Sequence, residues 1–456
     1  MASLLDDLAE ILPADQLRTG DAALAYDRDL SDGTGHGAPL AVALPTSTEQ
    51  VAALVKAAGR HGAPIVPQGA RTGLAGGANA VDGCLVLSLE RMTRIVEVDV
   101  ADQVATVEAG VLTFDLATAA EKVGLFYPPD PGSWQTSTIG GNVATNAGGM
   151  RCVKYGVTRD FVRGLTVVLA SGDVVRTGRR TVKGVAGLDL TSLIVGSEGT
   201  LGIVTEVTVA LRPRPAEPVG VLAAFSTRKA ALAAADLMVA SERRPSILEF
   251  LDRDSVAAIS AFDPSAVLPA DAEAVLLVQS DEPGRTTGDA NEYAAISTFC
   301  GATTVEIGRD RAGVDALMQA RRSLHGAMRA VSGASLNEDV SVPRSRLAEL
   351  LDGIDEIAER MRMPIATAGH IGDGNLHPIV AFDPADATSV GLANETYQLV
   401  IGLAVSLGGT SSGEHGIGTL KRAHLEAELG PELRALQRAV KHAFDPEGLL
   451  NPGKKL

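Results

Sequence analysis

The chain has 456 residues, which is too long for a single hydrophobic core and predicts two or more domains. Its formal net charge of −16 argues against binding to nucleic acid or to anionic lipid surfaces. Aromatic residues make up only 3% of the chain, so we expect cores built from Ala, Val, Leu and Ile. No disulfide framework, CxxC or iron–sulfur motif is formed by the three cysteines, Cys84, Cys152 and Cys300.

The first twelve residues, MASLLDDLAEIL, are typical of a short acidic amphipathic helix. They lack the basic start of a secretory signal peptide, and no run of 18 apolar residues occurs in the chain. We therefore expect no transmembrane segment and a cytoplasmic location.

The first part of the chain alternates strand-like and helix-like segments. Residues 38–45 (APLAVALP) predict a buried strand, residues 47–61 predict a helix, and APIVPQG predicts a second strand. This βαβ-sized unit opens into a glycine-rich stretch, PQGARTGLAGGANA, at residues 67–80. The next elements, two strands and a helix, are expected at residues 85–89, 95–100 and 113–123.

A second irregular stretch covers residues 127–156, YPPDPGSWQTSTIGGNVATNAGGMRCVKYG. Thirty residues with so little hydrophobic periodicity are uncommon inside a compact domain unless the loop is functional. A hairpin is predicted at residues 165–178, and a glycine-rich turn separates two apolar runs at residues 192–211. RPRPAEP, residues 212–218, is the clearest linker in the chain.

Beyond this linker, strands alternate with amphipathic helices. The order VGVLAAF, helix, SILEF, AVLLVQS, helix, TTVEI has a βαββαβ pattern, which predicts a ferredoxin-like α+β sheet. Further helices are expected at residues 312–330, 344–362, 389–407 and 431–443.

The stretch GHIGDGNLHP, residues 369–378, carries two histidines around an Asp-Gly pair. Asp373-Gly374 is a strong signal for a two-residue type I′ hairpin turn, because that turn needs φ > 0 at both central positions. In this register His370 lies directly opposite His377, with Cβ atoms roughly 5 Å apart. Two imidazoles held in this way can share one metal ion, or they can form a hydrogen-bonding pair on a polar turn. The hairpin alone does not distinguish these two possibilities.

The glycine-rich stretch at residues 67–80 predicts an anion-binding loop. Glycines allow several backbone N–H groups to converge on a phosphate and form a nest without a basic side chain. No GxGxxG follows a strand and opens a helix, and no GxxxxGK[ST] occurs, so a Rossmann NAD site and a P-loop are not expected. A merely flexible loop would explain one glycine cluster, but not two clusters in one domain together with GSEGTLGIVTE.

Three motifs, PQGARTGLAGG, PDPGSWQTSTIGGNVATNAGG followed by KYG, and GSEGTLGIVTEV, resemble the FAD-binding domain of the vanillyl-alcohol oxidase/p-cresol methylhydroxylase superfamily. The resemblance implies a two-subdomain FAD-binding domain. The first loop would hold the pyrophosphate, the second would line the isoalloxazine and ribityl chain, and the GTLGI turn would approach from the other side. The implied FAD neighbours are Pro67, Gly69, Ala70, Arg71, Thr72, Gly73, Pro131, Thr138, Gly140, Gly141, Asn142, Thr145, Asn146, Gly202 and Ile203.

Several members of this superfamily attach the flavin covalently through a histidine of the first loop. Residues 67–80 contain no His or Cys. We therefore expect FAD to bind noncovalently.

The second half resembles the FAD-linked D-2-hydroxyacid dehydrogenase branch of the superfamily, which includes D-lactate dehydrogenase, the flavin subunit of glycolate oxidase and D-2-hydroxyglutarate dehydrogenase. The resemblance rests on GHIGDGNLHP, SGEHGIGTLKR and the closing FDPEGLLNPGK. The branch's GHxGDGNLH motif implies metal ligands at His370 and His377. Its SxEHG motif implies a third ligand at Glu414 and a base at His415.

The residue types fit this chemistry. Two imidazoles and one carboxylate form an open ligand set that leaves positions for water or substrate, and Zn²⁺ or Mn²⁺ is the expected metal. In an extended backbone the consecutive Glu414 and His415 would point to opposite sides, so that one faces the metal and the other the substrate. The alternatives are a metal-free site in which the histidines hydrogen-bond the substrate, and a His415 that is only a satisfied loop residue.

The expected reaction is oxidation of an alcohol by hydride transfer. The substrate hydroxyl and carboxylate would chelate the metal, which lowers the pKa of the hydroxyl. His415 would take the hydroxyl proton, because the pKa of a histidine lies near working pH, and the hydride would leave Cα for the flavin N5.

The substrate carboxylate also needs a cation. QARRSLHG, residues 319–326, lies where the branch carries an arginine in a WxxR-like helix, which implies Arg321, and a guanidinium fork fits a carboxylate. Arg322 is adjacent on another helix face, so the register could be off by one, and an exposed helix arginine is the alternative. Asn375, inside the hairpin, is the second expected substrate contact.

Departures from the 2-hydroxyglutarate enzymes bear on the substrate. Those enzymes carry a Thr four residues after the Arg and a Lys shortly before DxSxP, and these places fall on His325 and Asn337 here. Loss of the lysine weakens the case for a dicarboxylate, although His325 could still bind a second acidic or polar group. We therefore expect a small D-2-hydroxy monocarboxylate, lactate or glycolate.

Three alternatives to this function remain. One is a 2-hydroxyglutarate-type dicarboxylate dehydrogenase. Another is a different branch of the superfamily, such as a sugar or aldonolactone oxidase, although those enzymes lack the paired GHxGDGNLH and SxEHG motifs. The third is a flavin- or metal-binding module without catalysis.

The electron acceptor must be external, because iron–sulfur cysteines and an NAD motif are both missing. It could be a quinone, an electron-transfer flavoprotein, an iron–sulfur subunit or O₂, and a membrane-bound acceptor would place the protein peripherally at a membrane. A homodimer is compatible with the sequence, which does not determine the oligomeric state. We expect an α+β fold with an FAD-binding domain at 1–215, a substrate (cap) domain with the metal site at 216–445, and a segment at 446–456 that returns to the FAD domain.

Overall fold

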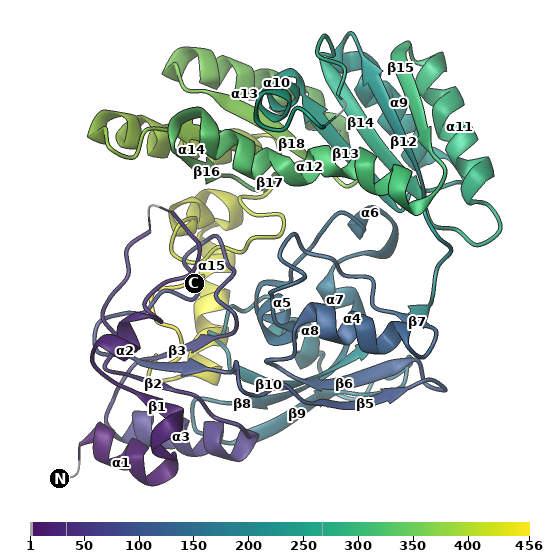
Figure 1. Ribbon diagram of the computed structural model, residues 1–456. Coiled ribbons are helices and arrows are strands. Elements are labelled where there is room, and N and C mark those ends of the chain that lie inside the picture. The colour runs from purple at the N-terminus through teal and green to yellow at the C-terminus, as the bar shows by residue number, and fades with distance from the viewer. Residues whose placement is uncertain (1–2, 33, 267) are drawn as a thin grey trace. The chain divides into compact units, whose positions relative to one another are not determined.

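The computed structural model describes residues 3–32, 34–266 and 268–456, which divide into two compact units (Figure 1). The first unit is made of Met1–Gly148, Val157–Arg214 and Glu414–Leu456. The second is made of Gly149–Gly156 and Pro215–Gly413.

This division differs from the expected one at the C-terminal end. The chain returns to the first unit at Glu414 rather than at residue 446, so helix α15 (Leu425–Phe444) belongs to that unit. Lys441 of this helix donates to the carbonyl of Thr200 at 2.7 Å and to that of Leu450 at 2.9 Å, which fixes the helix there. Nothing in the composition marks this return.

The loop between the two glycine-rich motifs also departs from the expected division. Gly149–Gly156, with helix α6 (Cys152–Tyr155), belongs to the second unit. Lys154 and Tyr155 explain this assignment, because both donate to the carboxylate of Asp281, at 2.6 and 2.7 Å.

The first unit contains two sheets. The smaller sheet has the order β1-β2-β4-β3, and its parallel core pairs β2 and β3 with β4. Its strands and helices are β1 (Leu17–Arg18), β2 (Ala41–Ala43), β3 (Ile65–Gln68), β4 (Leu85–Ser88), α1 (Leu4–Ile11), α2 (Asp21–Leu24) and α3 (Thr48–Arg60).

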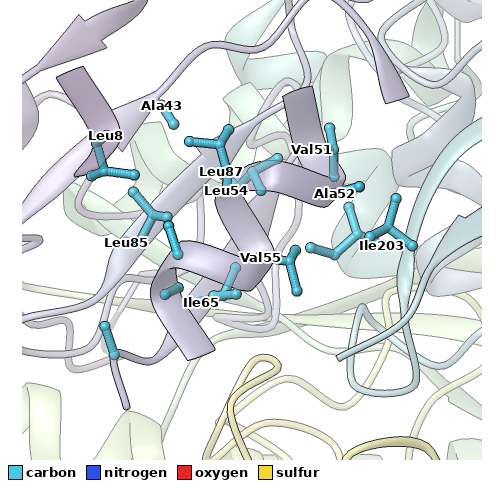
Figure 2. Close-up of a cluster of buried hydrophobic side chains, with 14 of the residues drawn as sticks. Leu8, Ala43, Val51, Ala52, Leu54, Val55, Ile65, Leu85, Leu87 and Ile203 are labelled. Carbon is cyan, nitrogen blue, oxygen red and sulfur yellow. The ribbon is translucent and has the colours of Figure 1, made fainter. Parts of the chain in front are cut away.

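Helices α1 and α3 begin at serine N-caps and cover this sheet. The side chain of Ser47 accepts a hydrogen bond from the N–H of Gln50 at the start of α3. Their apolar faces meet the strands in one buried cluster, in which Val51 and Leu54 of α3 lie beside Leu85 and Leu87 of β4 (Figure 2). This cluster holds β3 in place, and β3 leads directly into the first glycine-rich loop.

The larger sheet of the first unit is antiparallel, with the order β5-β6-β10-β8-β9. The expected hairpin on Ser171-Gly172-Asp173 is present between β8 and β9, and Gly172 has φ +78. The elements are β5 (Ile95–Asp99), β6 (Val104–Glu108), β8 (Val162–Val168), β9 (Val174–Gly178), β10 (Ile203–Ala210), α4 (Thr113–Glu121), α5 (Ile139–Thr145), α7 (Thr158–Phe161) and α8 (Leu190–Ile194), with β7 (Leu125–Phe126) paired to β11 (Arg212–Pro213).

The second unit is built on one large sheet, with the path β15-β12-β14-β13-β18-β19-β16 and β17 beside β19. The first four strands in chain order occupy the spatial order fourth, first, third, second, all antiparallel, which is the predicted ferredoxin-like arrangement. The strands are β12 (Val219–Phe225), β13 (Ile247–Asp252), β14 (Ala274–Ser280), β15 (Ala302–Gly308), β16 (Ala334–Asn337), β17 (Val340–Ser341), β18 (Ile365–His370) and β19 (Asn375–Phe382).

Helices α10 and α12 pack together over one face of this sheet. Val256 and Ile259 of α10 join Val314 and Met318 of α12 in an apolar cluster with the strands. Among the described residues, no helix is both long enough and apolar enough to cross a membrane. The helices of this unit outside α6 are α9 (Arg228–Ala240), α10 (Arg253–Phe262), α11 (Thr286–Phe299), α12 (Arg311–Ser332), α13 (Leu347–Met361) and α14 (Ala387–Ser406).

Candidate active site

The hairpin formed by β18 and β19 carries both histidines of GHIGDGNLHP, but its register is not the expected one. His370 lies opposite Asn375, and His377 lies opposite Ala368. The prediction that His370 and His377 face each other directly is therefore wrong. They are diagonal neighbours on one face of the sheet, because His377 is two residues beyond Asn375 along β19.

The turn explains this register. Four residues, Ile371 to Gly374, connect the strands, and the carbonyl of His370 accepts from the N–H groups of Asp373 and Gly374, each at 3.2 Å. Gly374 has φ +91 but Asp373 does not have a positive φ, so a type I′ turn is not formed. A Cβ at Gly374 would lie 2.3 Å from the carbonyl oxygen of Val342, which explains the glycine.

The two imidazole rings are buried and close to each other. The ring centroids lie 5.1 Å apart, with an interplanar angle of 85°. His370 is 5% exposed and His377 is 3% exposed. Nδ1 of His370 lies 2.5 Å from Oε1 of Glu249, and Nδ1 of His377 lies 3.3 Å from the carbonyl oxygen of Glu338. A neutral imidazole that donates from Nδ1 carries its lone pair on Nε2, so Nε2 is the atom through which each ring, when neutral, can bind a metal.

Asp339 adds a carboxylate to this face of the second unit. It is fully buried, and one of its oxygens lies within 4.8 Å of a ring nitrogen of His377, as does a ring nitrogen of His370. Two donor atoms at this spacing can bind one ion, and a set of nitrogen and oxygen ligands suits Zn²⁺ or Mn²⁺. Asp339 was not predicted from the sequence, although it lies only two residues after Asn337 in NEDVSVP, between β16 and β17.

The side chain of Asn375 is held by Asp339. Its Nδ2 donates to Oδ1 of Asp339 at 2.8 Å and to the carbonyl of Val340 at 3.0 Å. The second oxygen of Asp339 accepts from Ser412 at 2.8 Å. Because both hydrogens of the amide are engaged, Asn375 can offer a substrate only its acceptor oxygen.

Glu249 is the second group that the sequence analysis missed. It lies on β13, is 0% exposed, and its carboxylate accepts from Nε of Arg321 at 2.7 Å as well as from His370. An acidic residue inside the apolar strand segment SILEF was the available signal, since a buried charge needs a partner.

The charges around Glu249 keep its carboxyl ionised. Burial alone would raise its pKa, but the charge that His370 carries while it is protonated, the charge of Arg321 and the hydrogen bonds of both outweigh burial and lower the pKa to about 2. Three residues further along the same strand, burial raises the pKa of Asp252 to about 6, because Asp252 accepts only from backbone N–H groups and from Ser255.

Arg321 reaches this face from helix α12. Only its Nε is occupied by Glu249, and its two terminal amino groups make no further hydrogen bond to the described residues. The guanidinium therefore presents a fork that can bind a carboxylate. The side chain of Arg322 lies outside the described ones.

Two further predicted substrate residues lie on the same unit. Asn337 pairs with Ile379 across β16 and β19, which places it on the face that carries His377. Its Oδ1 is buried and has no hydrogen-bond partner among the described residues. His325 is exposed on α12. The sheet register therefore places Asn337, but not His325, on the face that carries the histidines.

Glu414 and His415 open the segment with which the chain returns to the first unit. Oε1 of Glu414 lies 3.9 Å from Nε2 of His415, so the two side chains converge instead of pointing to opposite sides as expected. The backbone here is bent and not extended, which explains the difference. Gly413, the preceding residue, lies so close to Asn375 that a Cβ would come within 2.3 Å of its Nδ2.

The first glycine-rich loop of the first unit leaves β3 at Gly69. None of the backbone N–H groups of residues 69–77 donates a hydrogen bond to another atom in the described ranges. An anion such as a pyrophosphate can accept hydrogen bonds from a run of available N–H groups like this one. Such a loop therefore needs no basic side chain to bind it. This loop holds five of the predicted FAD neighbours, Gly69, Ala70, Arg71, Thr72 and Gly73, while Pro67 lies in β3.

The second glycine-rich loop lies against the first one. A Cβ at Gly69 would meet Oγ1 of Thr138 at 2.3 Å, and one at Gly140 would meet the carbonyl of Ala109 at 2.8 Å. Thr138 caps α5, with its hydroxyl accepting from Gly141 at 3.1 Å. The close approach brings the two predicted FAD loops together within one unit.

Other predicted FAD neighbours support the second loop from within. The buried amide of Asn142 donates to Thr113 at 2.8 Å, and Thr145 donates to the carbonyl of Gly141 at 3.3 Å. Asn146 ends α5 with φ +55 and accepts from the N–H of Arg159. Pro131 is buried at the turn before Trp134, whose N–H donates to its carbonyl.

The GTLGI turn was expected to approach the flavin through Gly202 and Ile203. The side chain of Ile203 instead joins the buried cluster of the smaller sheet (Figure 2). A Cβ at Gly202 would lie 2.4 Å from Cγ1 of Val167, so this glycine serves strand packing. These two residues can line a cofactor with their backbone atoms, and their assignment as FAD neighbours stays a prediction.

The C-terminal segment fastens the first glycine-rich loop. The amide of Asn451 donates to the carbonyls of Gly77 and Glu198, at 3.0 and 2.7 Å, and Lys454 donates to the carbonyl of Asn79 at 2.6 Å. Because these bonds use carbonyls of the loop, its N–H groups remain available for a ligand. The two loops thus fit a cofactor that carries a pyrophosphate.

Comparisons with known proteins agree with this organisation. A model described as FAD linked oxidases, C-terminal domain, matches residues 214–455, and one described as FAD binding domain matches residues 39–178. The chain is 42% identical to the glycolate oxidase subunit GlcD of Bacillus subtilis over 91% of this chain and 88% of that protein. It is 35% identical to D-lactate dehydrogenase of Anaerostipes hadrus over 99% of this chain and 96% of that protein.

A solved structure shares the fold. The structure of p-cresol methylhydroxylase with bound substrate aligns with a TM-score of 0.82 over 99% of this chain and 96% of that one, at 17% identity. At this identity the likeness concerns the fold alone. With two glycine-rich loops that fit FAD, this α+β chain belongs to the FAD-linked oxidase family of oxidoreductases, on a fold of the p-cresol methylhydroxylase type.

Proposed function

We propose that this protein oxidises a small D-2-hydroxy acid, lactate or glycolate, to the 2-oxo acid. The observation that carries the proposal is the cluster on one face of the second unit. Buried Glu249 contacts Nδ1 of His370 and Nε of Arg321, and Nδ1 of the neighbouring His377 contacts the carbonyl of Glu338. The terminal amino groups of Arg321 bind none of the described residues. A ligand set and a carboxylate-binding fork together suit a substrate with a hydroxyl beside a carboxylate.

His370, His377 and Glu414 would hold a divalent metal, Zn²⁺ or Mn²⁺. The Nδ1 contacts of His370 and His377 support these two ligands, because they leave Nε2 as the metal-binding atom of each neutral ring. Glu414 follows directly on Gly413, which lies against the hairpin. Asp339 is a further carboxylate beside His377. A bound metal would supply Lewis-acid chemistry that lowers the pKa of a hydroxyl.

The remaining steps fall to side chains of this chain. Arg321 would bind the substrate carboxylate and so orient the Cα–H bond, while Asn375 would accept a hydrogen bond through Oδ1. His415 would accept the proton of the hydroxyl at its imidazole. Noncovalent FAD, held by the loops at residues 67–80 and 131–146, would supply the hydride acceptor.

The names of the two curated relatives support the substrate class, since one is a glycolate oxidase subunit and the other a D-lactate dehydrogenase. In place of the lysine of the 2-hydroxyglutarate enzymes this chain has Asn337, whose amide can donate and accept hydrogen bonds but carries no charge. The missing positive charge favours a monocarboxylate over a second carboxylate.

The experiment is a steady-state assay with an artificial electron acceptor across D-lactate, L-lactate, glycolate and D-2-hydroxyglutarate. We expect the highest kcat/KM with D-lactate or glycolate, loss of activity after treatment with EDTA, and recovery with Zn²⁺ or Mn²⁺. A preference for D-2-hydroxyglutarate would overturn the monocarboxylate, and unchanged activity after complete metal removal would overturn the metal.

A further inference from the structure

We propose that Glu249 is a positioning residue that couples the metal ligand His370 to the substrate-binding arginine Arg321. This inference rests on the proposed function, because it assigns roles to the same site. It adds a residue that touches neither substrate nor metal and that fixes two groups that do.

The sheet register explains how Glu249 reaches His370. Strands β13 and β18 are antiparallel, with Phe250 opposite Gly369 and Leu251 opposite Ala368. Continuing this register places Glu249 opposite His370, so the two side chains share one face of the sheet. A cross-strand neighbour is held by the backbone of both strands, which makes the contact reproducible.

The two oxygens of Glu249 are divided between the two partners. Oε1 lies 2.5 Å from Nδ1 of His370, and Oε2 lies 2.7 Å from Nε of Arg321. With Nδ1 engaged, the ring of His370 is fixed in one tautomer and one orientation, with Nε2 turned away from Glu249. With Nε engaged, the terminal amino groups of Arg321 form the outward fork.

Glu249 is buried, so its carboxylate interacts with protein groups and not with solvent. The residue is 0% exposed, and Arg321 and His370 are its two hydrogen-bond partners. A buried ion pair is often no more stabilising than well-packed apolar side chains, so stability alone does not account for a carboxylate here. The carboxylate of Glu249 fixes the tautomer of His370 and the orientation of the Arg321 guanidinium, which an apolar side chain could not do.

One carboxylate that holds both groups links the two halves of substrate binding. A tilt of the Glu249 side chain would displace His370 and Arg321 together, so the hydroxyl and carboxylate subsites keep a constant separation. Glu249→Gln retains the size of the side chain but loses the charge and one acceptor oxygen. It must therefore release or turn at least one partner.

The first test measures metal affinity without turnover, by competition of a chromophoric chelator with the protein for Zn²⁺ and then for Mn²⁺. We expect Glu249→Gln to bind the metal about 10- to 100-fold more weakly than the wild type. In the His370→Ala background, Glu249→Gln should weaken binding no further, because Glu249 acts through His370. Equal affinity of wild type and Glu249→Gln would overturn the inference, as would a second full loss in the His370→Ala background.

The second test separates KM from kcat. At saturating metal, Glu249→Gln should raise the KM for D-lactate clearly more in the wild-type background than in the Arg321→Met background. A KM change of the same size in both backgrounds would show that Glu249 does not act through Arg321 and would contradict that half of the inference.

Asp289→Asn is the matched control. Asp289 is also a buried carboxylate of the second unit, and it accepts from Arg243 at 2.8 Å and from Ser280 at 2.7 Å. Its substitution should lower stability but leave metal affinity and the KM unchanged. A wild type that binds neither Zn²⁺ nor Mn²⁺ would overturn the metal proposal and this inference together, whereas a wild type that binds metal as tightly as Glu249→Gln would overturn the inference alone.

Discussion

The two binding regions of this protein are built from different parts of the chain. The loop at residues 69–77 offers backbone N–H groups, and six of its nine residues are Gly or Ala. The hairpin of β18 and β19 offers side chains, because its backbone groups are hydrogen-bonded within the sheet. The first region therefore depends on the absence of Cβ atoms, and the second depends on the identity and register of a few residues.

This difference determines how each region can be damaged. In the loop, a larger side chain should prevent FAD from binding, whatever its chemical type. In the hairpin, a change of chemistry at constant volume should be enough. Substitutions that add volume to the loop, or that change the chemistry of the second region at similar volume, therefore test this difference.

Gly69→Val should have the largest effect. Even the first added carbon would lie 2.3 Å from Oγ1 of Thr138, so the two FAD loops must separate. We expect the purified protein to lose most of its FAD and its activity, measured by flavin absorbance per protein. Gly35→Ala is the control, since a Cβ there meets nothing within 4 Å; full FAD content in Gly69→Val would contradict the close approach.

His415→Ala should leave both binding regions intact and stop the chemistry. Loss of a general base typically costs about 10²- to 10⁴-fold, so flavin reduction by D-lactate should slow by that factor. FAD content and Zn²⁺ affinity should stay at wild-type values. Reduction at the wild-type rate would exclude His415 as the base.

Arg321→Lys keeps the charge and removes the fork. A hydrogen bond to a charged group contributes about 1.5–3 kcal/mol, so the KM for D-lactate should rise about 10- to 100-fold. Since Arg321 binds the carboxylate in both ground and transition state, kcat should change much less. An unchanged KM would assign the carboxylate to another residue.

Asp252→Asn should leave activity unchanged and alter only the pH dependence of stability. Burial raises the pKa of Asp252 to about 6 in the folded state from its ordinary value of 3.8, so its proton stabilises the fold fully below pH 3.8. This contribution is lost as pH rises through about 6, and a shift of about two units corresponds to about 3 kcal/mol. Chemical denaturation between pH 4 and 7 should show this decline in the wild type and lose it in the variant. The same slope in both proteins would assign the effect elsewhere.

The sequence was most informative where function depends on composition. The run of glycines at residues 67–80 predicted a backbone nest, and the structure leaves the N–H groups of residues 69–77 available. The βαββαβ pattern predicted the order of four strands, because alternating apolar runs and short turns restrict how a sheet can be wound.

It was least informative where function depends on register or on distant partners. Asp373-Gly374 predicted a two-residue turn, but contacts with Val342 favour a four-residue one, which moved His377 by two positions relative to His370. Glu249 lies 121 residues before His370 in the chain, so no spacing rule could link them. The bend at Glu414 and His415 was likewise invisible, since it depends on how Gly413 packs.

The central claim is that a 2-hydroxy acid reduces the flavin of this protein. The most direct measurement is the visible flavin absorbance of the purified holoenzyme under anaerobic conditions, before and after addition of D-lactate, then glycolate. We predict that the absorbance bleaches within the mixing experiment in the metal-loaded protein. A flavin that stays oxidised with every D- and L-2-hydroxy acid of the panel, or a protein that carries no flavin after gentle purification, would contradict the account.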